Sequence, residues 1–566
     1  MKSLIILIRY YREASFSPDT EKKEYNYNIP VGLAYISAYL QHHGHEVQFL
    51  NLNHLEGKVE DLIRERMSRE VFDFVITGGI SPFYADVKYC INCVREISPS
   101  TRIIAGGGII SSQPEIMFGL LKPDFGVIGE GELTIKELFD CLKTNGDLTI
   151  VNGLIFRDKN GEIYKTGIRD PILNLDELPW PDYEGLGFSE YIDHMLPSDT
   201  YYNTIFDTPR AYPIIASRSC PYSCTFCFHP LGKKYRQRSI DSIMAELESA
   251  IKKYNINLII FYDELFANDR KRTYELCRRL TELKKTVSWE IKWFCQMRVD
   301  ILDAELITVM KDAGCFYIGL GLESYSPKVL KSMKKFITPE QIDKAFHLCR
   351  EYNMAITGNF IFGDPAETKE TYQETLNYWK NNNATICNQV ILGLITLYQG
   401  SPLYQRAIEK GIVKDEVEFI EERAKRGINP INLTDNMSES DFQKMVQEIA
   451  EANIITPQYS VPLKIKNQDG IPEVHVMCPH CRNISIYKNI VIPPLFSFEK
   501  SDRRLLELVC RKCSGRIRLI TKHENITITI YRIFGYKTGV IIIRHILSPP
   551  LQGLRTFNKF LHKFID

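Results

Sequence analysis

The sequence predicts an α/β protein that combines two parallel-sheet domains with a small metal-binding domain. Three observations predict this fold: strand–helix alternation in residues 1–145, a second alternation in residues 205–410, and two paired C-x-x-C motifs near the C-terminus. At 566 residues the chain is too long for one hydrophobic core. The expected parts are a Rossmann-type domain at 1–145, a hairpin and linker at 146–204, a barrel at 205–410, a helical extension at 411–460 and a C-terminal domain at 461–566.

The first domain is expected to hold a parallel, doubly wound sheet. Its predicted strands are residues 3–7, 46–50, 74–77, 102–105 and 125–128, and its predicted helices are residues 31–42, 85–97 and 133–143. Ligands bind such sheets at the carboxyl ends of the strands. Those ends carry glycine runs, which let a large flat ligand approach the backbone, although each run alone also fits a tight turn. The runs are Gly78-Gly79, Gly106-Gly107-Gly108 and Gly129-Glu130-Gly131-Glu132.

The central region is expected to form a partial (β/α)6 barrel, preceded by a β-hairpin around Asn160-Gly161. Its predicted strands are residues 212–216, 258–261, 290–294, 316–320, 356–360 and 390–396. Barrel enzymes place their chemistry at the carboxyl ends of the strands. A salt bridge or a cap is the alternative role for a polar residue at such an end. The residues found there are Asp263, Glu264, Arg298, Glu323, Ser324, Gly358 and Gly363.

Three cysteines follow the first predicted barrel strand in a C-x-x-x-C-x-aromatic-C pattern. Cys220, Cys224 and Cys227 place three thiolates on one short loop, and the next cysteine is Cys277. A 4Fe-4S cluster normally has four cysteine ligands, so one iron of a cluster on this loop would stay open to a non-protein ligand. The alternative is a zinc knuckle or a set of buried structural thiols.

This cysteine motif resembles that of the radical S-adenosylmethionine (radical SAM) superfamily. The resemblance implies that the open iron binds S-adenosylmethionine, whose cleavage gives a 5′-deoxyadenosyl radical. It also implies roles near that cofactor for barrel residues: Asp263 and Glu264 near its amino group, Arg298 at its carboxylate, Glu323 at its ribose, with Ser324 beside it, and the strand between Gly358 and Gly363 beside its adenine.

The first domain resembles the cobalamin-binding domain found in one subfamily of these enzymes. The matching stretches are Pro30-Val31-Gly32-Leu33-Ala34-Tyr35, Gly44-His45-Glu46-Val47 and the glycine runs at 106–108 and 129–132. The resemblance implies that the glycine runs, with Glu130 and Glu132, bind cobalamin. The D-x-H-x-x-G loop of other corrinoid proteins is absent, so no histidine is expected on cobalt.

Four cysteines near the C-terminus form a second expected metal site. Cys478, Cys481, Cys510 and Cys513 make two C-x-x-C pairs, and four thiolates form a closed site that suits structural zinc. An auxiliary iron–sulfur cluster is the alternative. A nucleic-acid-binding zinc ribbon is a weaker one. Residues 541–564, which mix apolar and basic side chains, are expected to be a packed terminal segment; contact with a membrane surface or a partner is the alternative.

Composition limits the partners and the compartment. The formal net charge is zero, so no nucleic-acid partner is expected. Seven of the 15 cysteines fall in the two metal motifs, which suits a reducing cytoplasm. No apolar stretch is long enough to form a transmembrane segment. The expected partners are a low-potential electron donor of flavodoxin or ferredoxin type and a small-molecule, lipid or peptide substrate.

These features together indicate a cobalamin-dependent radical SAM enzyme. The expected reaction is methyl transfer to an unactivated carbon, or to phosphorus, by way of a 5′-deoxyadenosyl radical and methylcobalamin. A cyclisation or rearrangement without methyl transfer is the alternative, and a non-catalytic metal-binding scaffold is the alternative of another class. A tRNA methylthiotransferase is disfavoured, because Cys90, Cys93 and Cys141 do not match the second cysteine triad of that family.

Overall fold

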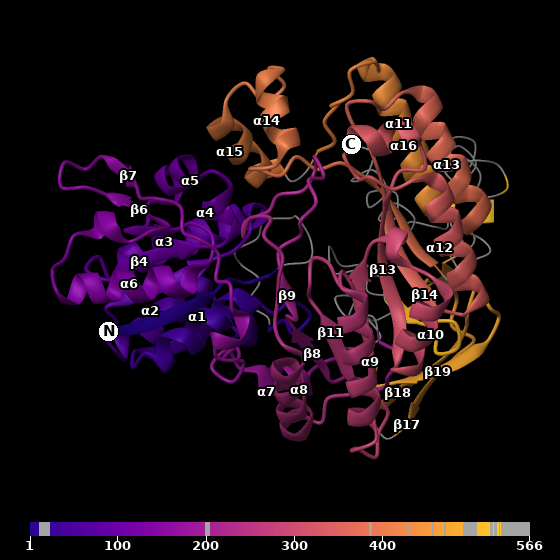
Figure 1. The fold of residues 1–566 in the computed structure, drawn as a ribbon, viewed down its shortest axis with the longest axis horizontal. Coiled ribbons are helices and arrows are strands. Elements are labelled where there is room, and N and C mark those ends of the chain that lie inside the picture. Colours follow the sequence, from indigo (N-terminus) through magenta and orange to yellow (C-terminus); the bar gives the residue numbers. More distant parts are fainter. Residues whose placement is uncertain are drawn as a thin grey trace, which may run out of the picture. The chain divides into compact units, whose positions relative to one another are not determined.

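The computed structural model describes residues 1–10, 23–197, 204–383, 388–426, 429–455, 458–468, 471–490 and 507–520, together with residues 525, 529, 530 and 533. The chain divides into two compact units, and it passes repeatedly from one to the other (Figure 1). Unit 1 consists of Met1–His194, Ile215–Tyr254 and Thr396–Asn429. Unit 2 consists of Met195–Ile214, Asn255–Ile395 and Pro430–Asp566.

Unit 1 is built on a seven-stranded sheet with the order β2-β1-β3-β4-β5-β6-β7. The first five strands are parallel, and their order is one of the common doubly wound arrangements, with its switch point between β1 and β3. The buried, apolar sequences of β1 and β3 explain why these strands were predictable. The strands are β1 Lys2–Leu7, β2 Glu46–Asn51, β3 Phe74–Gly78, β4 Arg102–Gly106, β5 Phe125–Val127, β6 Leu154–Arg157 and β7 Ile163–Lys165.

Helices connect these strands, as a doubly wound sheet requires. The helix α1 packs against α6, and α2 packs against α3. The three predicted helices are confirmed, whereas α2, α4, α5 and α7 were not predicted. The helices of this region are α1 Val31–His42, α2 Val59–Ser68, α3 Tyr84–Ile97, α4 Gly108–Ser112, α5 Pro114–Leu121, α6 Gly131–Lys143 and α7 Phe188–Asp193.

The predicted hairpin forms β6 and β7 and extends the sheet in the antiparallel sense. Its turn is fixed by Asp158, whose carboxylate accepts hydrogen bonds from the backbone N–H groups of Asn160 and Glu162. Unit 1 also contains a short antiparallel ladder and three later helices: β9 Ser217–Arg218, β10 Arg236–Gln237, α8 Ile240–Tyr254, α14 Pro402–Glu409 and α15 Glu416–Arg426.

Helix α15 returns to the first domain from far along the chain. The carboxylate of Glu421 accepts hydrogen bonds from the Tyr84 hydroxyl and the Lys88 ammonium group of α3, each at 2.7 Å. Gln113 also contacts Glu416. The structure therefore divides the predicted helical extension, because α15 belongs to unit 1 and the later helix α16 belongs to unit 2.

Unit 2 is built on a six-stranded parallel sheet with the order β15-β14-β13-β12-β11-β8. The six strands stand in the sheet in their order along the chain, with β8 and β15 at the two edges, and the intervening β9 and β10 form their own ladder, so the predicted partial barrel is confirmed. Its strands are β8 Ala211–Ile214, β11 Leu258–Phe261, β12 Lys292–Met297, β13 Cys315–Glu323, β14 Ala355–Phe362 and β15 Asn388–Leu394. Its helices are α9 Arg270–Lys284, α10 Ala304–Asp312, α11 Pro327–Ser332, α12 Pro339–Glu351 and α13 Lys369–Asn383.

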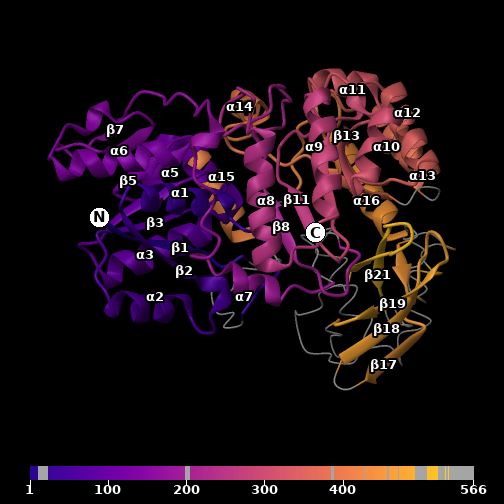
Figure 2. The same ribbon diagram turned by 60° about the horizontal axis from the view of Figure 1, so that its bottom comes forward.

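The C-terminal part of unit 2 begins with α16 (Glu439–Ile455), which packs against α13 and β15. Two small sheets follow, visible at the yellow end of the colour scale in Figure 2. Their strands are β16 Tyr459–Ser460, β17 Lys464–Gln468, β18 Ile471–Met477, β19 Ile484–Lys488, β20 Glu507–Val509 and β21 Arg516–Leu519. Residues 541–564 lie outside the described part of the chain. No helix in the described ranges is apolar and long enough to cross a membrane.

Candidate functional site

The glycine runs of unit 1 lie where parallel strands end, as predicted. A Cβ atom on Gly78 would lie 2.3 Å from the carbonyl oxygen of Gly106, and one on Gly107, whose φ is +84°, would lie 2.8 Å from that of Gly79. The turns after β3 and β4 therefore approach each other backbone to backbone. This packing requires glycine at positions 78 and 107 whatever ligand binds. The close approach of the two turns therefore explains part of the glycine pattern that was interpreted as a cofactor site.

The third run has a different environment. Gly129 has φ of +79° and follows β5, and the nearest atom to a Cβ built on it is the carbonyl oxygen of Pro230, at 3.9 Å. Pro230 lies in the loop that carries the three cysteines. The carboxyl edge of the unit 1 sheet and the cysteine loop are thus neighbours within one compact unit.

The cysteine loop spans residues 219–235 and is closed at its base by the ladder between β9 and β10. Cys224 is buried, and Cys220 and Cys227 are partly exposed. The backbone N–H of Cys227 donates to the carbonyl of Cys224, and that of Leu403 donates to the carbonyl of Thr225. Three thiols on one anchored loop suit an iron–sulfur cluster, because soft thiolate ligands favour iron–sulfur chemistry.

Glu130 and Glu132, predicted to contact cobalamin, make ion pairs with arginines that flank the cysteine loop. Arg218 donates to Glu130 Oε1 at 2.8 Å and to Glu132 Oε1 at 2.7 Å, and Arg236 donates to Glu130 Oε2 at 2.7 Å. All four side chains are buried. Sequence reasoning did not find the two arginines, which lie more than 80 residues from their partners.

Most of the predicted cofactor residues of the barrel share one edge of the unit 2 sheet, because they lie at or just after the carboxyl end of a parallel strand. Gly358 instead lies inside β14. Asp263 is buried and Glu264 is exposed after β11. Arg298 follows β12 and donates to Asp300 and to the carbonyl of Lys335. The guanidinium of Arg298 thus forms a salt bridge at a strand end. This is the alternative to a contact with the carboxylate of S-adenosylmethionine.

The remaining predicted residues lie at β13 and β14. Glu323, whose φ is +61°, accepts a hydrogen bond from Lys335 Nζ at 2.7 Å. Ser324 is buried, with its Oγ 3.1 Å from Thr375 Oγ1. A Cβ on Gly358 would lie 2.7 Å from the carbonyl of Leu320, and Gly363 has φ of +98°. Their contacts with S-adenosylmethionine stay predictions.

Glu367 is a buried acid that sequence reasoning missed, although it lies four residues after Gly363. It accepts a hydrogen bond from the Thr371 hydroxyl at 2.7 Å and one from the backbone N–H of Gly363 at 3.4 Å. Glu367 therefore holds the turn after β14. Burial raises its pKa from 4.5 to about 7, and the hydrogen bond from Thr371 opposes that shift.

The raised pKa of Glu367 predicts a pH dependence of stability. Because the folded protein binds this proton more tightly than the unfolded chain does, the contribution is fully present below about pH 4.5 and is lost as pH rises towards about 7. Glu367→Gln should flatten this part of the profile of the thermal midpoint against pH. An unchanged slope between those pH values in the variant would contradict the assignment.

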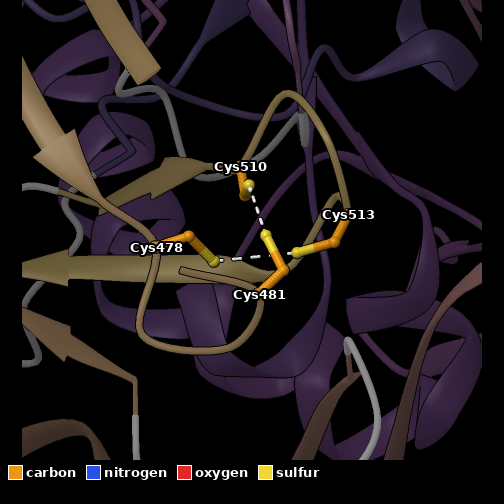
Figure 3. A group of neighbouring side chains, drawn as sticks. All are labelled: Cys478, Cys481, Cys510 and Cys513. Atoms are coloured by element: carbon orange, nitrogen blue, oxygen red, sulfur yellow. Dashed lines mark hydrogen bonds between the residues drawn. The ribbon is translucent and has the colours of Figure 1, made fainter. Parts of the chain in front are cut away.

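The four C-terminal cysteines form one compact group (Figure 3). Their Sγ atoms all lie within 4.8 Å of one another, and the Cys478–Cys513 and Cys481–Cys510 sulfur pairs are each 3.7 Å apart. Zinc–sulfur bonds of about 2.3 Å in a tetrahedron place sulfur atoms roughly 3.8 Å apart. The predicted group is confirmed, and its geometry fits a tetrahedral metal ion.

Two turns of matching conformation supply these thiols. The N–H of Cys478 donates to the carbonyl of Asn483, and the N–H of Cys510 donates to that of Gly515, both at 2.8 Å. The residue after each second cysteine, Arg482 and Ser514, has positive φ. Hydrogen bonds from the thiols of Cys478 and Cys513 lower the pKa of Cys510, which favours the thiolate that a metal requires.

Two family models match parts of this chain. A model of the radical SAM superfamily matches residues 214–378, and a model of the B12 binding domain matches residues 23–139. The chain is therefore a radical SAM enzyme. Within that superfamily it belongs to the enzymes that carry a cobalamin-binding domain, so its expected cofactors are a 4Fe-4S cluster, S-adenosylmethionine and cobalamin. These matches oppose the alternative of a non-catalytic scaffold.

Similar proteins include two different kinds of enzyme. The uncharacterized methyltransferase PH0819 of Pyrococcus horikoshii is 29% identical over 392 residues, which cover 68% of this chain and 79% of that protein. The anaerobic magnesium-protoporphyrin IX monomethyl ester cyclase of Rubrivivax gelatinosus is 27% identical over 424 residues, which cover 73% of this chain and 71% of that protein.

Solved structures share the fold. The radical S-adenosylmethionine methyltransferase TsrM from Kitasatospora setae, with tryptophan and a SAM analogue bound, superposes with a TM-score of 0.59 at 18% identity, covering 72% of this chain and 76% of TsrM. Another TsrM structure, with cobalamin and a [4Fe-4S] cluster bound, gives a TM-score of 0.56. These likenesses support the arrangement of a cobalamin-binding fold followed by a radical SAM fold.

Proposed function

We propose that this chain is a cobalamin-dependent methyltransferase that acts on an unactivated carbon centre, with a phosphorus centre as a second acceptor class. The observation that carries the proposal is the joint presence of the cysteine loop and the glycine-lined edge of the cobalamin-binding domain within unit 1. A cobalamin-binding edge beside the cluster loop suits methyl transfer, because cobalamin would carry the methyl group that a substrate radical takes. The similarity to PH0819 and to TsrM supports methyl transfer.

The residues proposed to hold the cofactors follow from their positions. Cys220, Cys224 and Cys227 would ligate the cluster, and the edge formed by the three glycine runs would receive cobalamin. The barrel edge that contains Asp263 and Glu323 would receive S-adenosylmethionine. When bound, these cofactors supply a reducing electron, a hydrogen-abstracting radical and a methyl donor, while the chain orients them and excludes side reactions.

Labelled S-adenosylmethionine tests the proposal. Reduced, reconstituted enzyme is mixed with an extract of cells that lack the gene, and the methyl-labelled cosubstrate is added. Methyl transfer to carbon should yield a labelled metabolite with both S-adenosylhomocysteine and 5′-deoxyadenosine. The similarity to the cyclase favours a second candidate, a ring-forming reaction, which should yield 5′-deoxyadenosine without S-adenosylhomocysteine or label transfer.

The electron donor is proposed to be a flavodoxin or ferredoxin type of protein, because the cluster needs a low-potential reductant. The zinc assignment of the C-terminal site is likewise a proposal. It rests on the closed set of four thiols and on the sulfur–sulfur distances, which suit a structural metal ion rather than one with an open position.

The structure supports a prediction about the cobalt ligand. His54, just after β2, is the histidine nearest in sequence to a strand end at the carboxyl edge, and its side chain is buried with Nε2 in a hydrogen bond. Nε2 lies 2.9 Å from the Tyr27 hydroxyl, and Nδ1 lies 3.7 Å from Glu190. Electron paramagnetic resonance of the cob(II)alamin enzyme should therefore show no axial nitrogen splitting from the protein. Splitting that disappears in His54→Ala would refute the prediction.

A further inference from the structure

The base of the cysteine loop holds two arginines directly opposite each other. In the ladder between β9 and β10, Arg218 pairs with Arg236. Like charges at directly opposed positions of an antiparallel pair destabilise it, and both of these guanidinium groups are buried. The loop therefore needs a buried anion to close at this point.

Glu130 supplies that anion from the first domain. Its Oε1 accepts from Arg218 at 2.8 Å, and its Oε2 accepts from Arg236 and from the backbone N–H of Ile172, each at 2.7 Å. One carboxylate thus bridges both strands of the ladder. Glu130 is also the residue that precedes α6, where the helix dipole favours a negative charge.

The network is complete and electrically balanced. Glu132 accepts from Arg218 at 2.7 Å, so two carboxylates face two guanidinium groups. The Arg218 guanidinium also lies 4.9 Å from the centre of the Tyr35 ring, in a cation–π contact. Buried charges persist only when they are paired and hydrogen-bonded in this way.

The network continues to the first cysteine through Ser219. Arg236 donates to Ser219 Oγ at 3.0 Å and to the carbonyl of Lys234 at 2.9 Å. Ser219 is buried and has φ of +69°, a backbone conformation that a non-glycine residue adopts only when its surroundings hold it there. The next residue is Cys220.

We infer that Glu130, with Glu132, is a positioning residue that locks the cysteine loop against the cobalamin-binding domain, rather than a residue that contacts cobalamin. The inference deepens the proposed function, on which it rests only in taking the loop as the cluster site. In this inference, the Gly129-Glu130-Gly131-Glu132 run connects the cobalamin-binding edge to the cysteine loop. The glycines allow the close approach of the chains, and the glutamates hold the loop in place.

The test compares Glu130→Gln with Glu137→Gln in the full-length protein. Glu137 lies on α6, the helix that Glu130 precedes, and pairs with Arg169, but it is partly exposed and makes no ion pair with Arg218 or Arg236. Amide hydrogen exchange is measured on the protein before reconstitution, iron release to a chelator is measured after it, and hydroxocobalamin affinity is measured by titration. None of these readouts requires turnover, so failure of the methyltransferase proposal would not affect them.

Glu130→Gln should accelerate exchange in residues 216–238 and release iron at least about tenfold faster, because it leaves buried Arg236 without its carboxylate and Arg218 with only one of its two. Its hydroxocobalamin affinity should match that of the wild type, and Glu137→Gln should match the wild type in every readout. Weaker hydroxocobalamin binding with unchanged loop exchange would overturn the inference in favour of a cobalamin contact. Unchanged exchange and iron release would overturn it as well.

A double variant guards against a general loss of folding. Glu130→Gln combined with Arg236→Gln removes one charge of each sign and leaves the Arg218–Glu132 pair intact. If the network acts as a unit, the double variant should release iron more slowly than the product of the two single effects predicts. Strictly multiplicative effects on iron release would show that the two substitutions act independently. Faster exchange throughout the unit 2 sheet would show that they unfold the protein. Either result would overturn the inference.

Discussion

Replacing Cys220, Cys224 and Cys227 together by alanine is expected to abolish cleavage of S-adenosylmethionine to 5′-deoxyadenosine. These thiols are the proposed ligands of the cluster that supplies the electron. The loss of cleavage activity should therefore exceed the roughly 10–100-fold effect of mutating residues that only hydrogen-bond to a metal ligand. The measurement is 5′-deoxyadenosine formed by anaerobically reconstituted, reduced protein, together with iron content and absorbance.

Two comparisons make this result interpretable. Iron content is compared with that of the wild type rather than with zero, because the C-terminal thiols form a second metal-capable group. Cys277→Ala is the control, because Cys277 is a buried thiol of α9 whose pKa burial raises to about 12. That variant should keep its iron and its cleavage activity. A triple variant that still forms 5′-deoxyadenosine would overturn the cluster assignment.

The sequence predicted the central strands of the unit 1 sheet well because these are buried on both faces. Strand β1 and strand β3 are almost wholly buried, so their apolar runs are continuous and easily recognised. The helices that were missed lack such a signal. Helix α2 buries only Val59 and Ile63, and α4 begins at Gly108, inside a glycine run that also indicates a turn.

The two metal motifs were predictable because their ligands are close in the sequence. The C-x-x-C pairs at Cys478 and Cys510 each form one turn, and joining the two turns needs only a small β-domain. The ion pairs of Glu130 were not predictable, because no periodic or local pattern links it to Arg218 and Arg236. A glycine-flanked glutamate suggests a ligand site, and only the fold reveals that its partners are arginines of the chain itself.

The same limit applies at the barrel edge. Arg298, Glu323 and Ser324 were placed correctly at strand ends, because strand ends can be located from hydrophobicity. Their local partners depend on residues of other elements: Lys335 pairs with Glu323, and Thr375 lies beside Ser324. Polar residues at strand ends therefore serve the fold in this structure, and any role towards a cofactor would be added to that one.

Loss of the C-terminal metal should unfold the ribbon around it, by which we mean the strands β18–β21 and the two cysteine turns. It should have little effect on the radical chemistry. The core of this domain includes Cys478 and Cys510 themselves, packed with a few apolar side chains, so it has little hydrophobic stabilisation apart from the metal. Structural zinc contributes about 10–16 kcal/mol in small zinc-finger peptides, comparable with the roughly 5–15 kcal/mol that holds a whole domain folded. Binding the metal and folding the ribbon should be one event.

Cys510→Ser combined with Cys513→Ser is therefore expected to lose about one metal equivalent per chain, by the logic of one closed four-thiolate site. The variant should become sensitive to protease in residues 471–490 and 507–520. The ribbon also contacts the segment before β8, since Asp207 accepts from the backbone N–H of Lys488 at 2.9 Å and pairs with Arg511. Faster amide exchange near residue 207 should accompany the loss of metal.

Lys512→Ala is the matched control for this experiment, because Lys512 lies in the same turn but is exposed and is not a ligand. It should keep the metal and the protease resistance of the wild type. The folded fraction of the double variant should still form 5′-deoxyadenosine, because the cluster loop belongs to unit 1 and the ribbon to unit 2. If the double variant instead stays folded, loses several iron atoms and stops cleaving S-adenosylmethionine, the site holds an auxiliary iron–sulfur cluster, and the ribbon belongs to the electron path.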